Sequence, residues 1–118
     1  MNLAMVRKPN IPHVSPVWFN ASGTDIKNGV IYFNTARGRV KASLKEGSDV
    51  AFSILDPDNP YMYVGGNAKV TKVISGPEAD DHIDTLAKKY QGVEKYPWRK
   101  PGEARIKLQL KVSKLHSR

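Results

Sequence analysis

The feature that most constrains the fold is a regular alternation near the C-terminus, in residues 104–115, ARIKLQLKVSKL. The apolar members fall at every second position: Ile106, Leu108, Leu110 and Val112. Successive side chains of a β-strand point to opposite faces, so this pattern predicts a strand with one buried face. Such a strand needs partners in a sheet.

Five other segments are rich in β-branched, aromatic or aliphatic residues and are predicted strands: 3–6, 13–19, 30–35, 49–56 and 61–74. Pro16 cannot donate a ladder hydrogen bond, so segment 13–19 should be bulged there or lie at a sheet edge. Gly65 and Gly66 predict a break in the long strand, caused by a bulge or by close approach of another backbone. The turn-forming residues of 20–29 predict a hairpin loop.

One substantial helix is predicted, from Glu78 to Gln91. Pro77 suits its first position, acidic residues crowd its first turns, and Gly92 suits its C-terminal cap. An apolar stripe recurs at helical spacing: Ile83, Leu86, Ala87 and Tyr90. The fold class that follows is mainly β, a β-barrel with minor α: a six-stranded antiparallel split barrel with one main helix between its last two strands.

Length and composition limit the remaining possibilities. A chain of 118 residues with 40% hydrophobic content is expected to form a single domain, 1–118. It contains no run of about 20 apolar residues and no apolar N-terminal region, so we expect no membrane segment and a cytoplasmic location. Absence of cysteine excludes disulfides and thiol chemistry. The three histidines lack metal-ligand spacing, so no metal site is predicted, and no P-loop or GxGxxG motif occurs.

The net charge of +8 is concentrated in residues 95–118, where eight Lys or Arg accompany one acidic residue. This segment can attract nucleic acid or another polyanion. It can equally keep outward strand faces soluble and protect sheet edges. Nucleic acid is the less probable partner, because the aromatic residues are not interleaved with the lysines as stacking platforms for bases.

Residues 30–46, VIYFNTARGRVKASLKE, carry the clearest functional signal. A strand ends at Asn34 and Thr35, and a helix is expected to begin near Arg37 or Gly38. Backbone donors at a helix start, a hydroxyl group and the cations Arg39 and Lys41 together favour a phosphate site. A solvated basic turn is the alternative reading of the same segment.

Six aromatic residues form a second candidate group: Trp18, Tyr61, Tyr63, Tyr90, Tyr96 and Trp98. Each could stack on a planar ligand, although most residues of these types pack in cores. Tyr96 and Trp98 lie in a proline-rich loop, and a core role explains them less well than a cover over a neighbouring subunit.

Four segments in this order resemble the pyridoxamine-phosphate-oxidase-like FMN-binding split-barrel family, and most closely its branch that depends on the deazaflavin coenzyme F-420. The segments are PHVSPVWF, IYFNTARGRVKASL, DPDNPYMYV and HIDTLAKKYQGVEKYP, within residues 12–97. The resemblance implies a homodimer with cofactor sites at its interface. It also implies FMN or the deazaflavin as cofactor, and transfer of hydride or electrons to a small unsaturated acceptor.

The resemblance assigns cofactor-binding roles to matching residues. Asn34, Thr35 and Ala36 fall at the strand end that touches the cofactor, and Arg39 and Lys41 match the phosphate-binding cations. The strand that lines the ring system corresponds to Ser15, Pro16, Val17 and Trp18. Tyr61 and Tyr63 match positions that approach the cofactor from its far side or from the other subunit. No catalytic residue is assigned, since the cofactor performs the hydride chemistry. The alternative function is a non-enzymatic basic β-barrel that binds nucleic acid or another polyanion.

Overall fold

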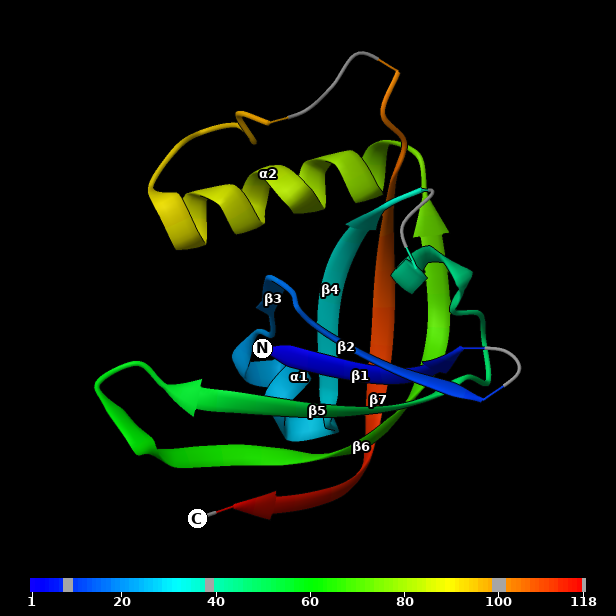
Figure 1. Cartoon of the computed structure of the whole chain (residues 1–118). Coiled ribbons are helices and arrows are strands. Elements are labelled where there is room, and N and C mark those ends of the chain that lie inside the picture. The colour runs from blue at the N-terminus through cyan, green and yellow to red at the C-terminus, as the bar shows by residue number, and fades with distance from the viewer. Residues whose placement is uncertain (8–9, 38–39, 99–101, 118) are drawn as a thin grey trace.

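A single antiparallel sheet of seven strands curls into a half-barrel, and the longer of two helices lies across one end of it (Figure 1). The computed structural model describes residues 1–7, 10–37, 40–98 and 102–117. The elements are β1 (Asn2–Arg7), β2 (Ile11–Pro16), β3 (Phe19–Asn20), α1 (Gly23–Asn28), β4 (Val30–Ala36), the 3₁₀ helix η1 (Val40–Ser43), β5 (Asp49–Asp56), β6 (Asn59–Ser75), α2 (Pro77–Gln91) and β7 (Arg105–Ser117).

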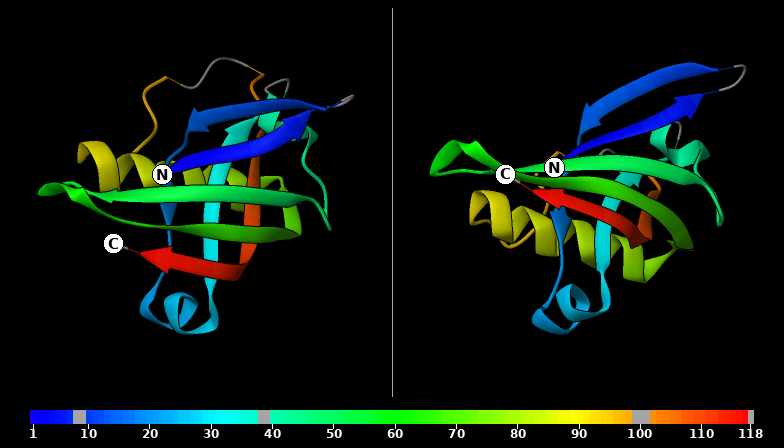
Figure 2. Two further views of the ribbon diagram at one scale, coloured as in Figure 1. Left: turned by 60° about the horizontal axis from the view of Figure 1, so that its bottom comes forward. Right: turned by 90° about the horizontal axis from the view of Figure 1, so that it is seen from below.

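The strand order is β2-β1-β5-β6-β7-β4-β3, and all neighbours are antiparallel. The two longest strands, β6 with 17 residues and β7 with 13, pair from Val64 with Ser117 to Ser75 with Ile106. Both strands bend along their length, as the two views of Figure 2 show. Because these strands are curved, the sheet forms a half-barrel. This confirms the predicted fold class, a mainly β barrel with minor α.

The predicted break in the long strand at Gly65 and Gly66 is wrong, because β6 runs through both glycines without interruption. The close approach of another backbone is confirmed. A Cβ atom on Gly65 would lie 2.8 Å from the carbonyl oxygen of Phe52, and one on Gly66 would overlap the carbonyl group of Lys114. Glycine is therefore what allows β5 and the end of β7 to flank β6 so closely.

The main helix α2 follows its predicted range to within one residue. Pro77 begins it, and Gly92 ends it in the left-handed conformation, with φ of 70°. Its buried face consists of Ala79, His82, Ile83, Leu86 and Ala87. This face packs against β4, β6 and β7. Tyr90 was predicted to share the apolar stripe, but 39% of its surface is exposed.

Two predictions in residues 13–29 need correction. The predicted strand 13–19 ends at Pro16 and resumes as the two-residue β3, which raises the strand count from six to seven. The edge position predicted from Pro16 is confirmed, since β2 is the first strand of the sheet. The predicted hairpin loop 20–29 contains α1. Ser22 caps this helix reciprocally with Asp25, and Gly29 ends it at φ of 70°.

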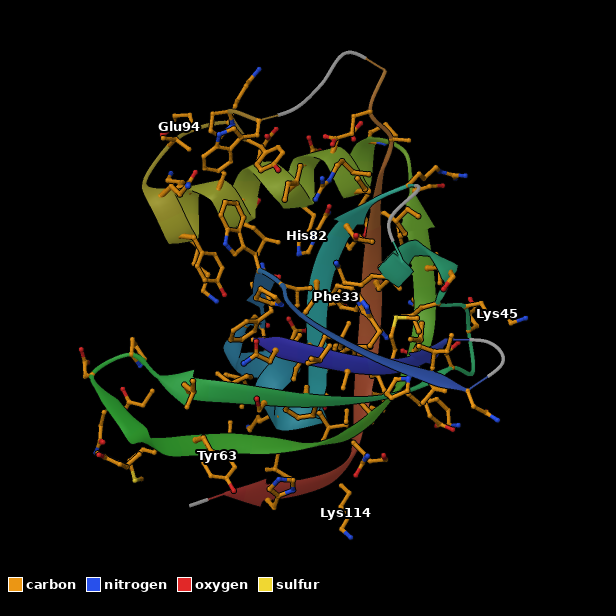
Figure 3. The ribbon with its side chains drawn as sticks, viewed as in Figure 1. Phe33, Lys45, Tyr63, His82, Glu94 and Lys114 are labelled. Atoms are coloured by element: carbon orange, nitrogen blue, oxygen red, sulfur yellow. The ribbon has the colours of Figure 1, made fainter. Side chains whose placement is uncertain are left out.

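The core fills the concave side of the curled sheet with apolar side chains from β1, β4, β5, β6 and β7, together with Val17 and Leu44. The predicted inward face of β7 is confirmed: Ile106, Leu108 and Leu110 are buried, and Val112 is half-buried. Phe33, which is fully buried, lies near the centre (Figure 3). Within the described residues, no helix is long and apolar enough to cross a membrane.

We expect Gly66→Ala to lower the free energy of unfolding by about 1–3 kcal/mol, because the new methyl group must displace the backbone of β7. Chemical denaturation followed by circular dichroism measures the change. Gly23→Ala is the matched control, since nothing lies within 4 Å of a Cβ at Gly23, in the first turn of α1. Equal stability of the two variants would contradict the close-approach explanation.

Candidate functional site

A cavity of about 460 Å³ lies where α2, the end of β4, the start of β7 and the link between β2 and β3 meet. Its lining residues are Met1, Pro16, Val17, Trp18, Asn34, Thr35, Ala36, Lys41, Ile83, Tyr90, Tyr96, Trp98, Glu103 and Arg105. Seven of the residues predicted to bind a cofactor are among them. The structure thus brings residues 16–18 together with residues 34–36 and Lys41, which the sequence had linked only through a family resemblance.

One wall of the cavity is polar and cationic. Asn34 and Thr35 are buried at the end of β4, and the strand register sets Ala36 opposite Arg105 at the start of β7. Lys41 belongs to η1, which follows β4. Arg105 is only 8% exposed, and its Nη1 lies 3.6 Å from Oε1 of Glu103. Two positive charges and one carboxylate therefore share this wall.

A hydrogen-bond network behind this wall joins three elements. The Nε of Arg105 on β7 donates to Oδ1 of Asn34 on β4, at 2.8 Å. The Nδ2 of Asn34 donates to the carbonyl oxygen of Ala79 at 2.9 Å and lies 3.1 Å from Nδ1 of His82, both on α2. The Nε2 of His82 lies 2.8 Å from Oδ1 of Asn20 on β3. Figure 3 shows His82 pointing from α2 toward β4.

The protonation state of His82 gives each bond of this network a direction. Burial, with smaller contributions from the nearby charges of Lys107 and Arg105, lowers the pKa of His82 to about 4. The imidazole is therefore neutral at pH 7 and carries one proton. The oxygen of Asn20 can only accept, so the proton is on Nε2, and Nδ1 accepts from Asn34.

A second wall of the cavity is aromatic. The rings of Trp18 and Tyr90 stack nearly parallel, 5.2 Å apart between centroids and inclined by 7°. Tyr96 packs edge-on against Trp18 at 6.0 Å, and Trp98 lies 6.3 Å from Trp18. The Tyr90 hydroxyl and the backbone of Phe19 are in hydrogen-bonding contact, which fixes the Tyr90 ring. Four aromatic side chains from three parts of the chain thus form a surface suited to a planar group.

Three of the predicted cofactor-binding residues that the structure describes do not line this cavity. Ser15 is in β2 and does not line it; its buried Oγ has no hydrogen-bond partner among the described residues. Arg39 lies outside the described residues. Tyr61 and Tyr63 are exposed on β6, and Figure 3 places Tyr63 at the end of the sheet away from α2.

The helix expected to begin near Arg37 or Gly38 is not an α-helix. Arg37 is in a turn, Gly38 lies outside the described residues, and the chain then forms the four-residue 3₁₀ helix η1. Its Leu44 amide bonds to the carbonyl of Lys41, the i→i+3 pattern of a 3₁₀ turn. One such turn has almost no macrodipole, so the helix-dipole argument for a phosphate site is wrong. The positive charge at this turn comes from the side chain of Lys41.

The sequence analysis missed Arg105, Glu103 and His82 as site residues. His82 follows Ala79 by three positions and therefore falls on the buried face of α2, a signal that the helical spacing did contain. Arg105 shares the predicted outward face of β7 with Lys107 and Gln109, and no local pattern distinguishes it. Among the described residues, no group of three or more His, Cys, Asp or Glu side chains is placed to hold a metal ion.

Comparison with known proteins identifies the fold class first. No protein-family model and no curated protein matches the sequence. The structure is similar to a conserved hypothetical protein from Mycobacterium tuberculosis, Rv2991, with a TM-score of 0.62 and 17% identity over 98% of this chain and 74% of that one. At this identity the similarity concerns the fold alone, a curled antiparallel half-barrel with minor α.

A second solved structure is more informative. This chain is similar to a protein described as F-420 reductase, with a TM-score of 0.72 and 26% identity over 98% of this chain and 86% of that one. The two chains share the curled antiparallel half-barrel fold.

We expect stability to depend on pH through His82. Its folded pKa, about 4, lies below the ordinary value of 6.5, so the unfolded chain binds the extra proton first. The contribution of His82 to stability is complete above pH 6.5 and is lost as pH falls toward 4, by at most about 3 kcal/mol. Urea denaturation at pH 7.5, 5.5 and 4.5 measures it. In His82→Gln this part of the pH dependence should disappear; parallel curves for both proteins would refute the assignment.

Proposed function

We propose that the cavity binds a flavin or deazaflavin and that the protein is an oxidoreductase, which transfers hydride or electrons to a small unsaturated acceptor. The observation that carries the proposal is the pairing of a cationic wall with an aromatic wall in one cavity. FMN and the deazaflavin both combine a planar ring with a phosphate-bearing chain. The similarity to F-420 reductase makes the deazaflavin the favoured cofactor.

The residues present fit such a group. Lys41 and Arg105 would hold its phosphate, with the Thr35 hydroxyl as a further hydrogen-bonding group. The ring would lie against Pro16, Val17 and the aromatic wall. When bound, the cofactor would supply the hydride chemistry, while the protein binds it, orients it and excludes water. No side chain is proposed as general acid or base.

We further propose a homodimer in which Tyr61 and Tyr63 approach the partner's cofactor site. Both lie on the β5–β6 hairpin, far from the cavity of their own chain, beside other exposed apolar residues. The exposed set comprises Leu55, Tyr61, Met62 and Tyr63, with Tyr61 the most exposed at 76%. A patch of this kind on a small protein commonly marks a contact with another chain.

Cofactor binding can be followed by intrinsic fluorescence, because both tryptophans of the chain, Trp18 and Trp98, line the cavity. We expect saturable quenching by F-420 or FMN at micromolar concentration. Lys41→Ala should weaken binding by about tenfold, as expected for one charge-assisted hydrogen bond. Lys45→Ala is the control, since Lys45 is exposed, lies outside the cavity and carries the same charge. If neither cofactor binds below millimolar concentration, the proposed function fails.

The dimer is tested by light scattering. We expect a mass near twice the 13.1 kDa of one chain, and a shift toward the monomer in Tyr61→Ser/Met62→Ser. Removing two exposed apolar side chains from an interface lowers its hydrophobic stabilisation. Val73→Ser is the control. Val73 is also an exposed apolar residue of β6, but it lies beyond the part of β6 that pairs with β5. If the wild-type protein has the mass of a single chain even at high protein concentration, the dimer is excluded.

A further inference from the structure

Arg105 is held in the cavity wall by contacts on several sides. Its Nε donates to Asn34, its Nη1 faces Glu103, and its guanidinium carbon lies 5.2 Å from the centre of the Tyr96 ring. The separation of 3.6 Å from Glu103 is longer than a charge-assisted hydrogen bond of 2.7–2.9 Å. An anion bound in the cavity would add a charge-assisted hydrogen bond to this cation, which is 8% exposed.

The orientation of this guanidinium depends on the Asn34 amide, and the orientation of the amide depends in turn on His82. Both Nδ2 hydrogens of Asn34 are used, one by the carbonyl of Ala79 and one by Nδ1 of His82. Its Oδ1 therefore faces the Nε of Arg105. If the amide flipped, its NH₂ group would oppose the donor of Arg105, and its oxygen would face the lone pairs of two acceptors. The flipped state would lose all three hydrogen bonds.

A fourth residue prevents His82 from relaxing this arrangement. Asn20 accepts from Nε2 and so keeps Nδ1 as an acceptor. The network thus runs from β3 through α2 and β4 to β7, and each bond fixes the direction of the next. Its last member is the cationic group of the cavity.

We propose that Arg105 binds the anionic group of the cavity's ligand, and that His82 and Asn34 are positioning residues that hold its guanidinium in the binding orientation. The inference rests on the proposed function only in taking the anion to be the cofactor's phosphate. A guanidinium fixed through Nε holds its planar fork of N–H donors in a set orientation, which suits the geometry of a phosphate. Because it is ordered before the ligand arrives, binding loses less conformational entropy.

The test compares FMN with riboflavin, which differ by the phosphate, using quenching of Trp18 and Trp98. The ratio of the two dissociation constants isolates the phosphate contact. We expect Arg105→Lys to reduce this ratio by about tenfold or more, since the planar fork is lost while the charge remains. His82→Leu should reduce it by about three- to tenfold. His82→Gln can restore an acceptor for Asn34 and should stay within about twofold of wild type.

Two further variants complete the design. His13→Leu removes an imidazole from the edge strand β2, outside the cavity, and should leave the ratio unchanged. Because leucine at a buried histidine position can cost stability, Asn20→Ala provides a milder route to the same disruption. Without the Asn20 oxygen, the imidazole is free to carry its proton on Nδ1, where it opposes the Asn34 donor. We expect the ratio to fall by about threefold.

Two results would overturn the inference. In the first, His82→Leu and Asn20→Ala weaken FMN and riboflavin equally, which is the behaviour of residues that only maintain the fold. In the second, they leave the ratio at its wild-type value while Arg105→Lys lowers it, which would mean that Arg105 needs no positioning.

Inorganic pyrophosphate separates this inference from the proposed function, because it carries the anion without a ring. We expect it to raise the melting temperature of the wild type and of His82→Gln, and to have little effect on Arg105→Lys or His82→Leu. If this pattern holds while neither FMN nor F-420 binds, the anion site stands and the proposed function falls. If flavins bind while pyrophosphate affects every variant alike, the proposed function stands and this inference falls.

Discussion

The pairing of β6 with β7 is the interaction on which the rest of the molecule depends. These strands are consecutive in the sheet but separated in the chain by α2, so their register fixes where that helix can lie. β5 and β4 are added to the outer edges of this pair, and the curvature of the pair closes the half-barrel around the core. Gly65 and Gly66 are required for this pairing, because a side chain at either position would collide with the backbone of Phe52 or Lys114.

The candidate site is a consequence of how α2 returns to this sheet. The helix packs most of its buried face through small and aliphatic side chains, but at His82 it meets Asn34, and the contact is polar. A buried polar group costs stability unless its donors and acceptors are satisfied. Here the described partners of Asn34 satisfy both of its donors and its acceptor. These bonds fix how α2 lies on the sheet at His82 and which way the Asn34 amide faces. The cavity lies beside this contact.

The sequence predicted those helices and strands whose defining residues all lie within the element or at its ends. β5 matches the predicted range, and α2 and β7 match to within two residues, because alternation, helical spacing and capping residues define them. The error at α1 had a local cause: Ser22 and Asp25 form a capping box, but the surrounding Asn, Gly and Asp residues suggested a turn. The approach of the segments around Trp18 and Asn34 came from the family resemblance, since no local pattern encodes it.

No local pattern in the sequence indicates that Arg105 is buried. In the alternation of β7 it falls on the polar side, but in the structure it contacts Asn34, Glu103 and the Tyr96 ring and is 8% exposed. Long-range contacts of this kind are invisible in strand periodicity. The same limit applies to Tyr61 and Tyr63: the sequence marks them only as aromatic residues that could stack on a planar ligand, and in the structure they are exposed on β6 and do not line the cavity.

The choice of histidine at the helix–sheet contact also decides the charge that a ligand meets. An apolar residue at position 82 would leave one Asn34 donor unsatisfied, and a lysine or arginine would add a third cation beside Arg105 and Lys107. Neutral imidazole avoids both costs, because it accepts one hydrogen bond, donates another and carries no charge at pH 7. The proximity of these cations and the burial of the ring both disfavour its protonation. The positive potential of the cavity therefore comes from the side chains of Arg105 and Lys41 and not from His82. In the proposed role of Arg105, an anion entering the cavity would meet a cation in a fixed orientation, held by a histidine that does not itself take part in the contact.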